Sequence, residues 1–275
     1  MNHMDLSDKL QKLKEIIRQY NHVIVAYSGG VDSVFLLKVT LDTLGKENVV
    51  ACIGISDSLA QSELTDAKNV AAKIGAKLKL VYPQEMKNPD YLANPNNRCY
   101  FCKTALYSLL TTLAKTENID AVFSGTNKDD MGDYRPGIAA GNEHKIISPL
   151  QLAGFTKEEI RSESKRLQLP TWDKPAMPCL SSRIAYGIPV TTERLAQIER
   201  GESYLKQLGL TNYRVRHHDT LARIEVDANS LEKITDIAVR EALVTHFKSL
   251  GFTYITLDLQ GFRSGSGNAL LQLKK

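Results

Sequence analysis

The sequence SGGVDS at residues 28–33 decides the fold of this chain, because of the segments on either side of it. The β-branched run VIVAY at residues 23–27 comes directly before it and predicts a buried parallel strand. The apolar stretch at residues 34–44 comes directly after it and predicts a helix. Because ligands of α/β proteins bind where such strands end, the six residues predict a phosphate-binding loop.

Each residue type in this loop suits a nucleotide phosphate. Gly29 and Gly30 let the backbone turn sharply and approach a phosphate, while Ser28, Ser33 and the N–H groups at the helix start face the anion. Asp32 would repel phosphates unless a cation intervenes, so we expect it to hold Mg²⁺ that bridges phosphate oxygens. The structural alternative is a glycine turn capped by Asp32 or Ser33. Because no GxxxxGK[ST] sequence occurs, adenylyl transfer fits better than a γ-phosphate site.

Strand and helix patterns alternate along the first half of the chain. We expect strands at residues 23–27, 49–55, 79–82 and 121–124. We expect helices at residues 6–17, 34–44, 59–74 (with a capping box from Ser58 to Gln61), 103–116, and 157–167 (capped by Thr156 and Glu159). This alternation predicts an α/β fold with a doubly wound parallel sheet and the nucleotide at the carboxyl ends of its strands.

Polar residues follow the strand at 121–124, at the same edge of the predicted sheet as the glycine loop. They form either a solvated turn or part of the nucleotide pocket, and their position favours the pocket. The nucleotide-binding candidates are Gly125 and Asp129, and the turn also contains Asn127, Lys128, Asp130 and Asp133.

The sequence divides into two domains and a linker. Residues 1–169 form the nucleotide domain. Residues 170–190 hold four of the nine prolines and also Cys179, and predict an irregular linker. Residues 191–275 predict a smaller α+β domain, which we expect to bind substrate and to support a homo-oligomer. Its expected elements are a helix at 193–208, strands at 213–216 and 222–227, a helix at 231–250 and a strand at 254–259.

The cysteines form the second informative pattern. Cys52 lies in the apolar run at residues 49–55, where a cysteine acts as a small hydrophobic residue. Cys99 and Cys102 form a CxxC pair, and Cys179 stands alone far downstream. The pair is either a reversible redox pair or part of a metal site, because a structural disulfide is improbable in a cytosolic setting.

The metal alternatives differ in their ligands. A zinc site would need a fourth ligand such as His217 or His218, whereas three thiolates suit an iron–sulfur cluster with one iron open to a substrate or an extra sulfur atom. Lys103 and Arg98 flank the CxxC pair and should lower the thiol pKa values in either case.

Two arginines in the C-terminal domain predict an anion site. Arg214 and Arg216 alternate along a predicted strand, so both point to one face and can clamp a substrate phosphate, helped by Ser182. A solvated edge strand is the alternative.

Glu202 lies on the apolar face of the predicted helix at 193–208 and therefore needs a partner. It either pairs with a basic residue such as Arg223 or acts in the site as a base or metal ligand.

Composition is that of a soluble globular enzyme, with 43% apolar and 24% charged residues among 275. No stretch approaches the roughly 20 apolar residues of a membrane span, and the start MNHMDLSDKL lacks a secretory hydrophobic region, so we expect a cytoplasmic protein with no membrane partner. The net charge of +4 is too weak for a dedicated nucleic-acid binder.

Six segments together resemble the LarE family of ATP-dependent sulfur transferases over about residues 10–267. They are SGGVDS, CYFCK, YRPG at 134–137, PCLSSR, RVRHHDTLARIE and TLDLQGFRSG. The resemblance implies an ATP pyrophosphatase domain of the adenine nucleotide alpha-hydrolase type. It also implies that ATP adenylylates the carboxylates of a pyridinium-3,5-biscarboxylate mononucleotide, and that sulfur then replaces AMP to leave a thiocarboxylate, in the synthesis of a nickel-pincer nucleotide cofactor.

The resemblance also assigns roles to residues. Cys179 matches the sulfur-donor cysteine, and Cys99, Cys102 and Cys179 match the members that hold a 4Fe-4S cluster and are not consumed. Lys103, with Mg²⁺ on Asp32, would neutralise the departing pyrophosphate. The alternatives are a tRNA thiolase with the same nucleotide loop and a three-cysteine cluster, and a carrier that uses ATP only as a switch.

Overall fold

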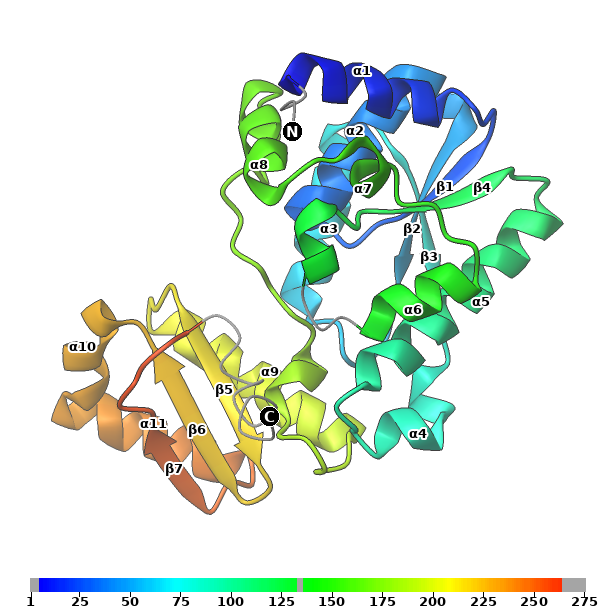
Figure 1. The fold of residues 1–275 in the computed structure, drawn as a ribbon. Helices are drawn as coiled ribbons and strands as arrows, with labels where there is room; N and C mark the ends of the chain where they lie inside the picture. Colours follow the sequence, from blue (N-terminus) through cyan, green and yellow to red (C-terminus); the bar gives the residue numbers. More distant parts are fainter. Residues whose placement is uncertain (1–4, 133–135, 264–275) are drawn as a thin grey trace. The chain divides into compact units, whose positions relative to one another are not determined.

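The structure is a computed structural model that describes residues 5–132 and 136–263 (Figure 1). The chain forms two compact units, residues 1–88 with 97–177, and residues 89–96 with 178–275. Residues 89–96 join the second unit through Asn94, whose Nδ2 donates to the carbonyl oxygens of Ala185 at 2.9 Å and Ile188 at 2.8 Å. The predicted linker at 170–190 therefore spans the division between the units.

The sheet of the first unit has four parallel strands in the order β3-β2-β1-β4. They are β1 (Val23–Ala26), β2 (Val49–Gly54), β3 (Lys77–Val81) and β4 (Ala121–Ser124). After β3 the chain crosses to the other side of β1 to form β4, so the strand order reverses between β1 and β4. Ligands of such sheets bind at the carboxyl ends of the strands at this point. The predicted α/β fold class is confirmed.

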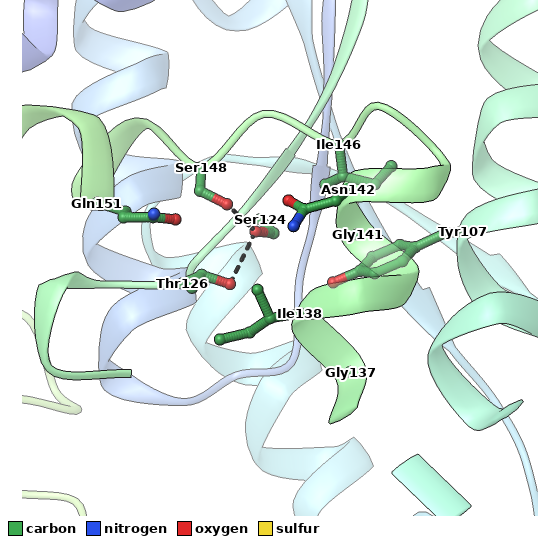
Figure 2. A pocket seen from close by; sticks show the side chains of 10 residues that line it. All are labelled: Tyr107, Ser124, Thr126, Gly137, Ile138, Gly141, Asn142, Ile146, Ser148 and Gln151. Carbon is green, nitrogen blue, oxygen red and sulfur yellow. Dashed lines mark hydrogen bonds between the residues drawn. The ribbon is translucent and has the colours of Figure 1, made fainter. Parts of the chain in front are cut away.

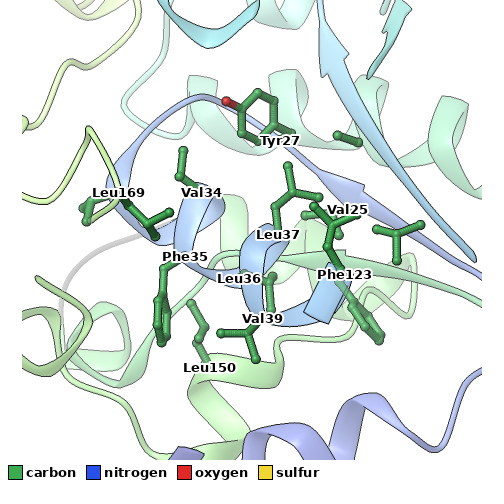
Figure 3. Close-up of a cluster of buried hydrophobic side chains, with 14 of the residues drawn as sticks. Val25, Tyr27, Val34, Phe35, Leu36, Leu37, Val39, Phe123, Leu150 and Leu169 are labelled. Atoms are coloured by element: carbon green, nitrogen blue, oxygen red, sulfur yellow. The ribbon is translucent and has the colours of Figure 1, made fainter. Parts of the chain in front are cut away.

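Helices cover both faces of this sheet, and the strand residues alternate between two cores. Val23 and Val25 of β1 belong to one core, and Ile24 belongs to the other. The first core, part of which is shown in Figure 3, packs the sheet against helices α1 (Leu6–Ile17), α2 (Val31–Leu44), α3 (Gln61–Lys73), α7 (Pro149–Ala153) and α8 (Lys157–Arg166). The second core packs it against α5 (Arg98–Thr116) and α6 (Pro136–Glu143).

Three helix starts in the first unit differ from prediction, and the first is that of α2, which begins at Val31 and not at residue 34. Helix α5 begins at Arg98, five residues before the predicted start at 103, so the CxxC pair lies in its first turn. The predicted capping box from Ser58 to Gln61 is wrong, because Ala60 is the N-cap of α3 and the Ser58 hydroxyl lies 2.9 Å from the Ser56 hydroxyl.

The capping box of α8 is confirmed. The Thr156 hydroxyl accepts from Glu159 N at 3.3 Å, and Glu159 Oε2 accepts from Thr156 N at 2.9 Å.

The second unit is the predicted α+β domain. Its mixed sheet has the order β5-β6-β7, with β5 (Tyr213–His218) antiparallel to β6 (Leu221–Val226) and β7 (Tyr254–Leu257) parallel to β6. Helix α9 (Thr192–Gln207) and the 3₁₀ turn η4 (Leu180–Arg183) also belong to this unit, as does the short helix α4 (Pro89–Leu92).

The single helix predicted at 231–250 is wrong. It is divided into α10 (Leu231–Thr235) and α11 (Ile237–Ser249), because the Asp236 carboxylate caps α11 by accepting from Ala238 N at 3.0 Å and Val239 N at 3.1 Å. None of the helices in the described ranges is long and apolar enough to span a membrane.

Helix α3 supports the loop after β1. Gly29 has φ of +74°, and a Cβ built on it would lie 2.7 Å from the Cβ of Ala67. The Tyr27 hydroxyl, two residues earlier, donates to the Ala67 carbonyl at 2.9 Å. The first glycine of SGGVDS is therefore fixed by backbone conformation and by close packing at once.

We expect Gly29→Ala to lower the free energy of unfolding by about 2–5 kcal/mol, since it adds a left-handed strain of about 1–2 kcal/mol to a clash of about 1–3 kcal/mol. Gly154→Ala is the matched control, because Gly154 has φ of +81° and nothing within 4 Å of its Cβ position. Urea unfolding followed by circular dichroism measures both. Equal losses in the two variants would contradict the packing argument.

Candidate functional site

The loop of residues 27–30 passes directly into α2, with Gly30 as the N-cap. The Ser33 hydroxyl donates to the Gly30 carbonyl at 3.0 Å and accepts from Ser28 N at 3.2 Å. The hydroxyls of Ser28 and Ser33 lie 3.1 Å apart. The loop is thus closed by its own serines around the start of a helix, where backbone N–H groups have no intrahelical acceptor and attract anions.

Asp32 is the centre of a polar network that joins the ends of β1 and β4. Its Oδ2 pairs with the ammonium of Lys157, and its Oδ1 accepts from Asn127 Nδ2 at 3.2 Å. Asn127 Oδ1 accepts from Asp129 N at 2.9 Å, and Asp129 Oδ2 accepts from Lys157 N at 2.8 Å. The structure therefore places the predicted nucleotide residues Asp32 and Asp129 in one network, with an ammonium and two carboxylates where phosphates and Mg²⁺ would bind.

Gly125 brings the loop after β4 against the loop after β1. A Cβ on Gly125 would lie 3.0 Å from the backbone nitrogen of Ser33. Any larger residue would push the two loops apart at the point where the strand order reverses. This close approach explains why a glycine stands directly after β4.

Lys157 was missed by reasoning from the sequence. It is the first residue of α8, a position where a cation opposes the positive end of the helix dipole. A lysine at a helix start needs a nearby anion. The unfavourable position of Lys157 is therefore the sequence signal that could have indicated its contact with Asp32. Lys103, the lysine predicted to act on pyrophosphate, lies with its Nζ 5.4 Å from the centroid of the Tyr107 ring, and its role stays a prediction.

A small polar pocket lies at the carboxyl end of β4 (Figure 2). The Ser124 hydroxyl lies 3.1 Å from that of Thr126 and 3.0 Å from that of Ser148. The enclosed volume of about 20 Å³ suits a single water molecule rather than a base or sugar ring. The lining residues are Tyr107, Ser124, Thr126, Gly137, Ile138, Gly141, Asn142, Ile146, Ser148 and Gln151.

Cys99 and Cys102 lie one turn apart at the start of α5 and therefore share a face of that helix. Cys99 is exposed and Cys102 is half-buried. The pKa of Lys103 is raised, first by its charge interaction with Tyr107 and then by those with the thiols of Cys102 and Cys99. The lysine and both sulfur atoms are thus close enough to interact electrostatically, and the helix start favours thiolates.

Cys179 lies in the second unit, exposed, as the N-cap of η4. Its carbonyl accepts from the Ser182 hydroxyl at 2.7 Å and from Arg183 at 3.1 Å. Arg183 also donates to the Pro178 carbonyl. Hydrogen bonds to its carbonyl groups therefore fix the backbone that carries the thiol, while the cysteine itself is exposed.

Glu202 holds Arg183 in place. Its Oε1 accepts from Arg183 Nε at 3.0 Å and from Val215 N at 3.2 Å, and its Oε2 accepts from Arg183 at 3.2 Å. Predicting Arg223 as the partner was wrong, since Arg223 pairs with Glu225 at 3.3 Å and with Asp258 at 3.6 Å. A buried pair of this kind fixes geometry, and breaking it would leave an uncompensated charge.

Arg214 and Arg216 lie on one face of β5, and both are buried. Arg216 makes a two-point contact with Glu225 at 3.0 and 3.1 Å and donates to the Ser182 carbonyl at 3.1 Å. Burial, followed by repulsion from Arg183, lowers the pKa of Arg214 to about 10. The Arg214 guanidinium donates to the Tyr213 carbonyl at 2.7 Å and lies 4.9 Å from the centroid of the Phe262 ring, and the phosphate-binding role of both arginines stays a prediction.

The metal predictions fall on different parts of the chain. Within residues 5–132 and 136–263, no group of three or more His, Cys, Asp or Glu side chains is placed to hold a metal ion. Cys99 and Cys102 belong to the first unit and Cys179 to the second, so the three-thiolate site stays a prediction. Asp133 and Tyr134 lie outside the described residues.

Comparison with known proteins agrees with this arrangement. A sequence model of the NAD synthase family matches residues 6–88, the region of the glycine loop. The pyridinium-3,5-bisthiocarboxylic acid mononucleotide synthase of Lactiplantibacillus plantarum is 36% identical over 97% of this chain and 96% of its own length. The chain belongs to the family of this synthase, the LarE family.

Two uncharacterized proteins extend this family match. A Synechocystis protein is 45% identical over 97% of this chain and 99% of its own length. A protein of Methanocaldococcus jannaschii is 32% identical over 93% of this chain and 98% of its own length. The predicted family resemblance is confirmed over nearly the whole chain.

His217, predicted as a possible zinc ligand, belongs to the interior of this LarE chain's second unit. It is 1% exposed, and its Nε2 lies 2.9 Å from Gln197 Oε1. Because Gln197 Nε2 donates to the Leu250 carbonyl at 2.7 Å, the Gln197 oxygen accepts and His217 Nε2 carries the proton. Burial, followed by the charge of Arg194, lowers the pKa of His217 to about 4.

This buried histidine predicts a pH dependence of stability. His217 stays neutral in the folded chain while the unfolded chain takes up a proton below pH 6.5, so stability is lost as pH falls from 6.5 toward 4. The full shift corresponds to about 3 kcal/mol. We expect His217→Gln to flatten the pH dependence in urea unfolding between pH 7 and 4.5, whereas the exposed-site control His22→Gln keeps it. An unchanged slope in His217→Gln would contradict this.

Proposed function

We propose that this protein is an ATP-dependent sulfur transferase that converts the carboxylates of a pyridinium-3,5-biscarboxylate mononucleotide into thiocarboxylates. The observation that carries the proposal is the Asp32–Lys157 network around the SGGVDS loop, in a chain of the LarE family. The name of the L. plantarum relative supports the substrate class, and the NAD synthase match supports adenylyl transfer from ATP.

The first step is adenylylation. An oxygen of the substrate carboxylate attacks the α-phosphorus of ATP, the bond to the β-phosphate oxygen breaks, and pyrophosphate leaves. Lys157, the serine hydroxyls and the N–H groups at the start of α2 face the phosphates and stabilise the negative charge on the leaving group. Asp32 and Asp129 supply carboxylate oxygens that would hold Mg²⁺, and the cation would neutralise phosphate charge when bound.

The second step transfers sulfur. A sulfur nucleophile attacks the acyl carbon, the bond from that carbon to the AMP oxygen breaks, and AMP leaves with one of the original carboxylate oxygens. Arg214 would bind the substrate phosphate, because it lies on the same buried face of β5 as Arg216 and presents a guanidinium that suits a phosphate. Arg183 and Ser182 hold the backbone of Cys179 so that its thiol stays exposed.

Three thiols are the donor set for a 4Fe-4S cluster. Cys99 and Cys102 fit as neighbouring ligands, because they share one face of α5 at its positive end. Cys179 would be the third ligand, and its exposure leaves the thiol accessible. When bound, such a cluster supplies an iron open to sulfide, so that sulfur transfer does not consume Cys179.

Pyrophosphate release tests the proposed function. We expect release from Mg-ATP to depend on the pyridinium dicarboxylate nucleotide and not to occur with bulk tRNA. We expect Asp32→Asn to lower the rate at least about 100-fold while circular dichroism stays unchanged, comparable to the loss of a transition-state charge contact. Release with tRNA alone would favour a tRNA thiolase, and an undiminished rate in folded Asp32→Asn would remove the loop from the mechanism.

Iron and sulfide content tests the cluster. Anaerobically purified protein is expected to be brown, with iron and acid-labile sulfide in near-equal amounts, and Cys99→Ala, Cys102→Ala or Cys179→Ala should lose both. Cys52→Ala is the control, because Cys52 is buried in the sheet and should leave both unchanged. Iron-free protein whose Cys179 loses the mass of hydrogen sulfide after a single turnover would contradict the cluster.

A further inference from the structure

One face of α8 carries a row of basic side chains spaced four residues apart, Lys157, Arg161 and Lys165. Residues at this spacing lie above one another on the helix surface. Like charges at this spacing destabilise an isolated helix by roughly 0.2–0.5 kcal/mol per pair. Partners outside the helix offset this repulsion for each member of the row.

The partners of this row are the nucleotide loop at one end and the connector, residues 170–178, at the other. Lys157 pairs with Asp32. The two terminal nitrogens of Arg161 donate to the carbonyls of Trp172 at 2.7 Å and Lys174 at 2.8 Å. Lys165 lies with its Nζ 4.6 Å from the centroid of the Trp172 ring, at cation–π distance.

Helix α3 joins the same two places. Lys174 Nζ lies 2.8 Å from Glu63 Oε2, and both side chains are only 18% exposed. Ala67, one turn after Glu63 on the same face of α3, is the residue against which Gly29 packs. The connector is thus fastened to both helices that contact the SGGVDS loop, and its nearest attachment on each helix lies one turn from that contact.

We propose that Arg161 is a positioning residue that couples nucleotide binding to the connector leading to Cys179. This inference rests on the proposed function for its chemical consequence. Phosphates that compete with Asp32 for Lys157 alter the contacts at the first turn of α8, and the rigid helix carries that change to Arg161. Cys179 follows Lys174 by five residues, a length of chain that spans at most about 18 Å. Where the connector is held therefore limits where the thiol can go.

The test uses the full chain with Arg161→Met, Arg161→Lys and the control Arg166→Met. Arg166 is a basic residue of the same helix that lies outside the row and pairs with Glu163 at 2.7 Å. Hydrogen exchange of the backbone amides at 171–177 is measured with and without Mg-ATP. Pyrophosphate release and thiocarboxylate formation are measured separately on the dicarboxylate nucleotide.

In the wild type and in Arg166→Met, Mg-ATP is expected to change exchange in the connector, and thiocarboxylate should accompany pyrophosphate. In Arg161→Met, Mg-ATP is expected to leave hydrogen exchange in the connector unchanged. Pyrophosphate release should stay near the wild-type rate, but the amount of thiocarboxylate formed per pyrophosphate should fall about tenfold, because the coupling between the two sites is lost. Arg161→Lys should be intermediate, since an ammonium cannot span both carbonyls. It also carries the test if Arg161→Met does not fold.

An equal ratio of thiocarboxylate to pyrophosphate in all four proteins would overturn the proposal. A parallel loss of pyrophosphate release and thiocarboxylate formation in Arg161→Lys would also overturn it, because it would indicate a merely structural role. The same holds if Mg-ATP does not change hydrogen exchange in the wild-type connector. If the wild type releases no pyrophosphate, the proposed function fails, but the exchange comparison still decides whether Arg161 couples the loop to the connector.

Discussion

The ion pair between Asp32 and Lys157 connects the start of α2 to the start of α8 across the point where the strand order reverses. The two side chains are 23% and 37% exposed, and a pair this open to solvent stabilises a fold by no more than about 1 kcal/mol. Its importance is therefore positional. It keeps a carboxylate and an ammonium beside a helix N-terminus, where each group can leave its partner and bind a ligand instead.

The second unit places its charges differently. Arg183 is 2% exposed and Glu225 is fully buried, so these groups cannot turn to solvent and must be satisfied inside the protein. Glu202 and Glu225 neutralise Arg183 and Arg216, which in turn hold the carbonyls of the segment around Cys179. The buried network therefore fixes the backbone of the segment that carries the exposed cysteine.

The sequence predicts features that depend on neighbouring residues better than features that depend on residues far apart in the chain. The strand at 121–124 and the capping box at Thr156 are predicted correctly, because strand patterns and helix caps depend on residues that are close together in the sequence. The role of Lys157, the pairing of Arg183 with Glu202, and the membership of residues 89–96 in the second unit were not read. Each depends on a partner that the fold brings from far along the chain. The start of α5 was placed five residues too late although its N-cap, Asn97, is a favoured capping residue type, and the Asn97 side chain makes no capping hydrogen bond.

The central claim is that a carboxylate of the substrate is adenylylated and then exchanged for sulfur. The most direct measurement is to supply the pyridinium dicarboxylate nucleotide with ¹⁸O in its carboxylates and to analyse the AMP by mass spectrometry. The account predicts AMP that carries one ¹⁸O atom, because the oxygen that attacked the α-phosphorus leaves with AMP when sulfur replaces it. Unlabelled AMP, or ADP and phosphate as products, would contradict it.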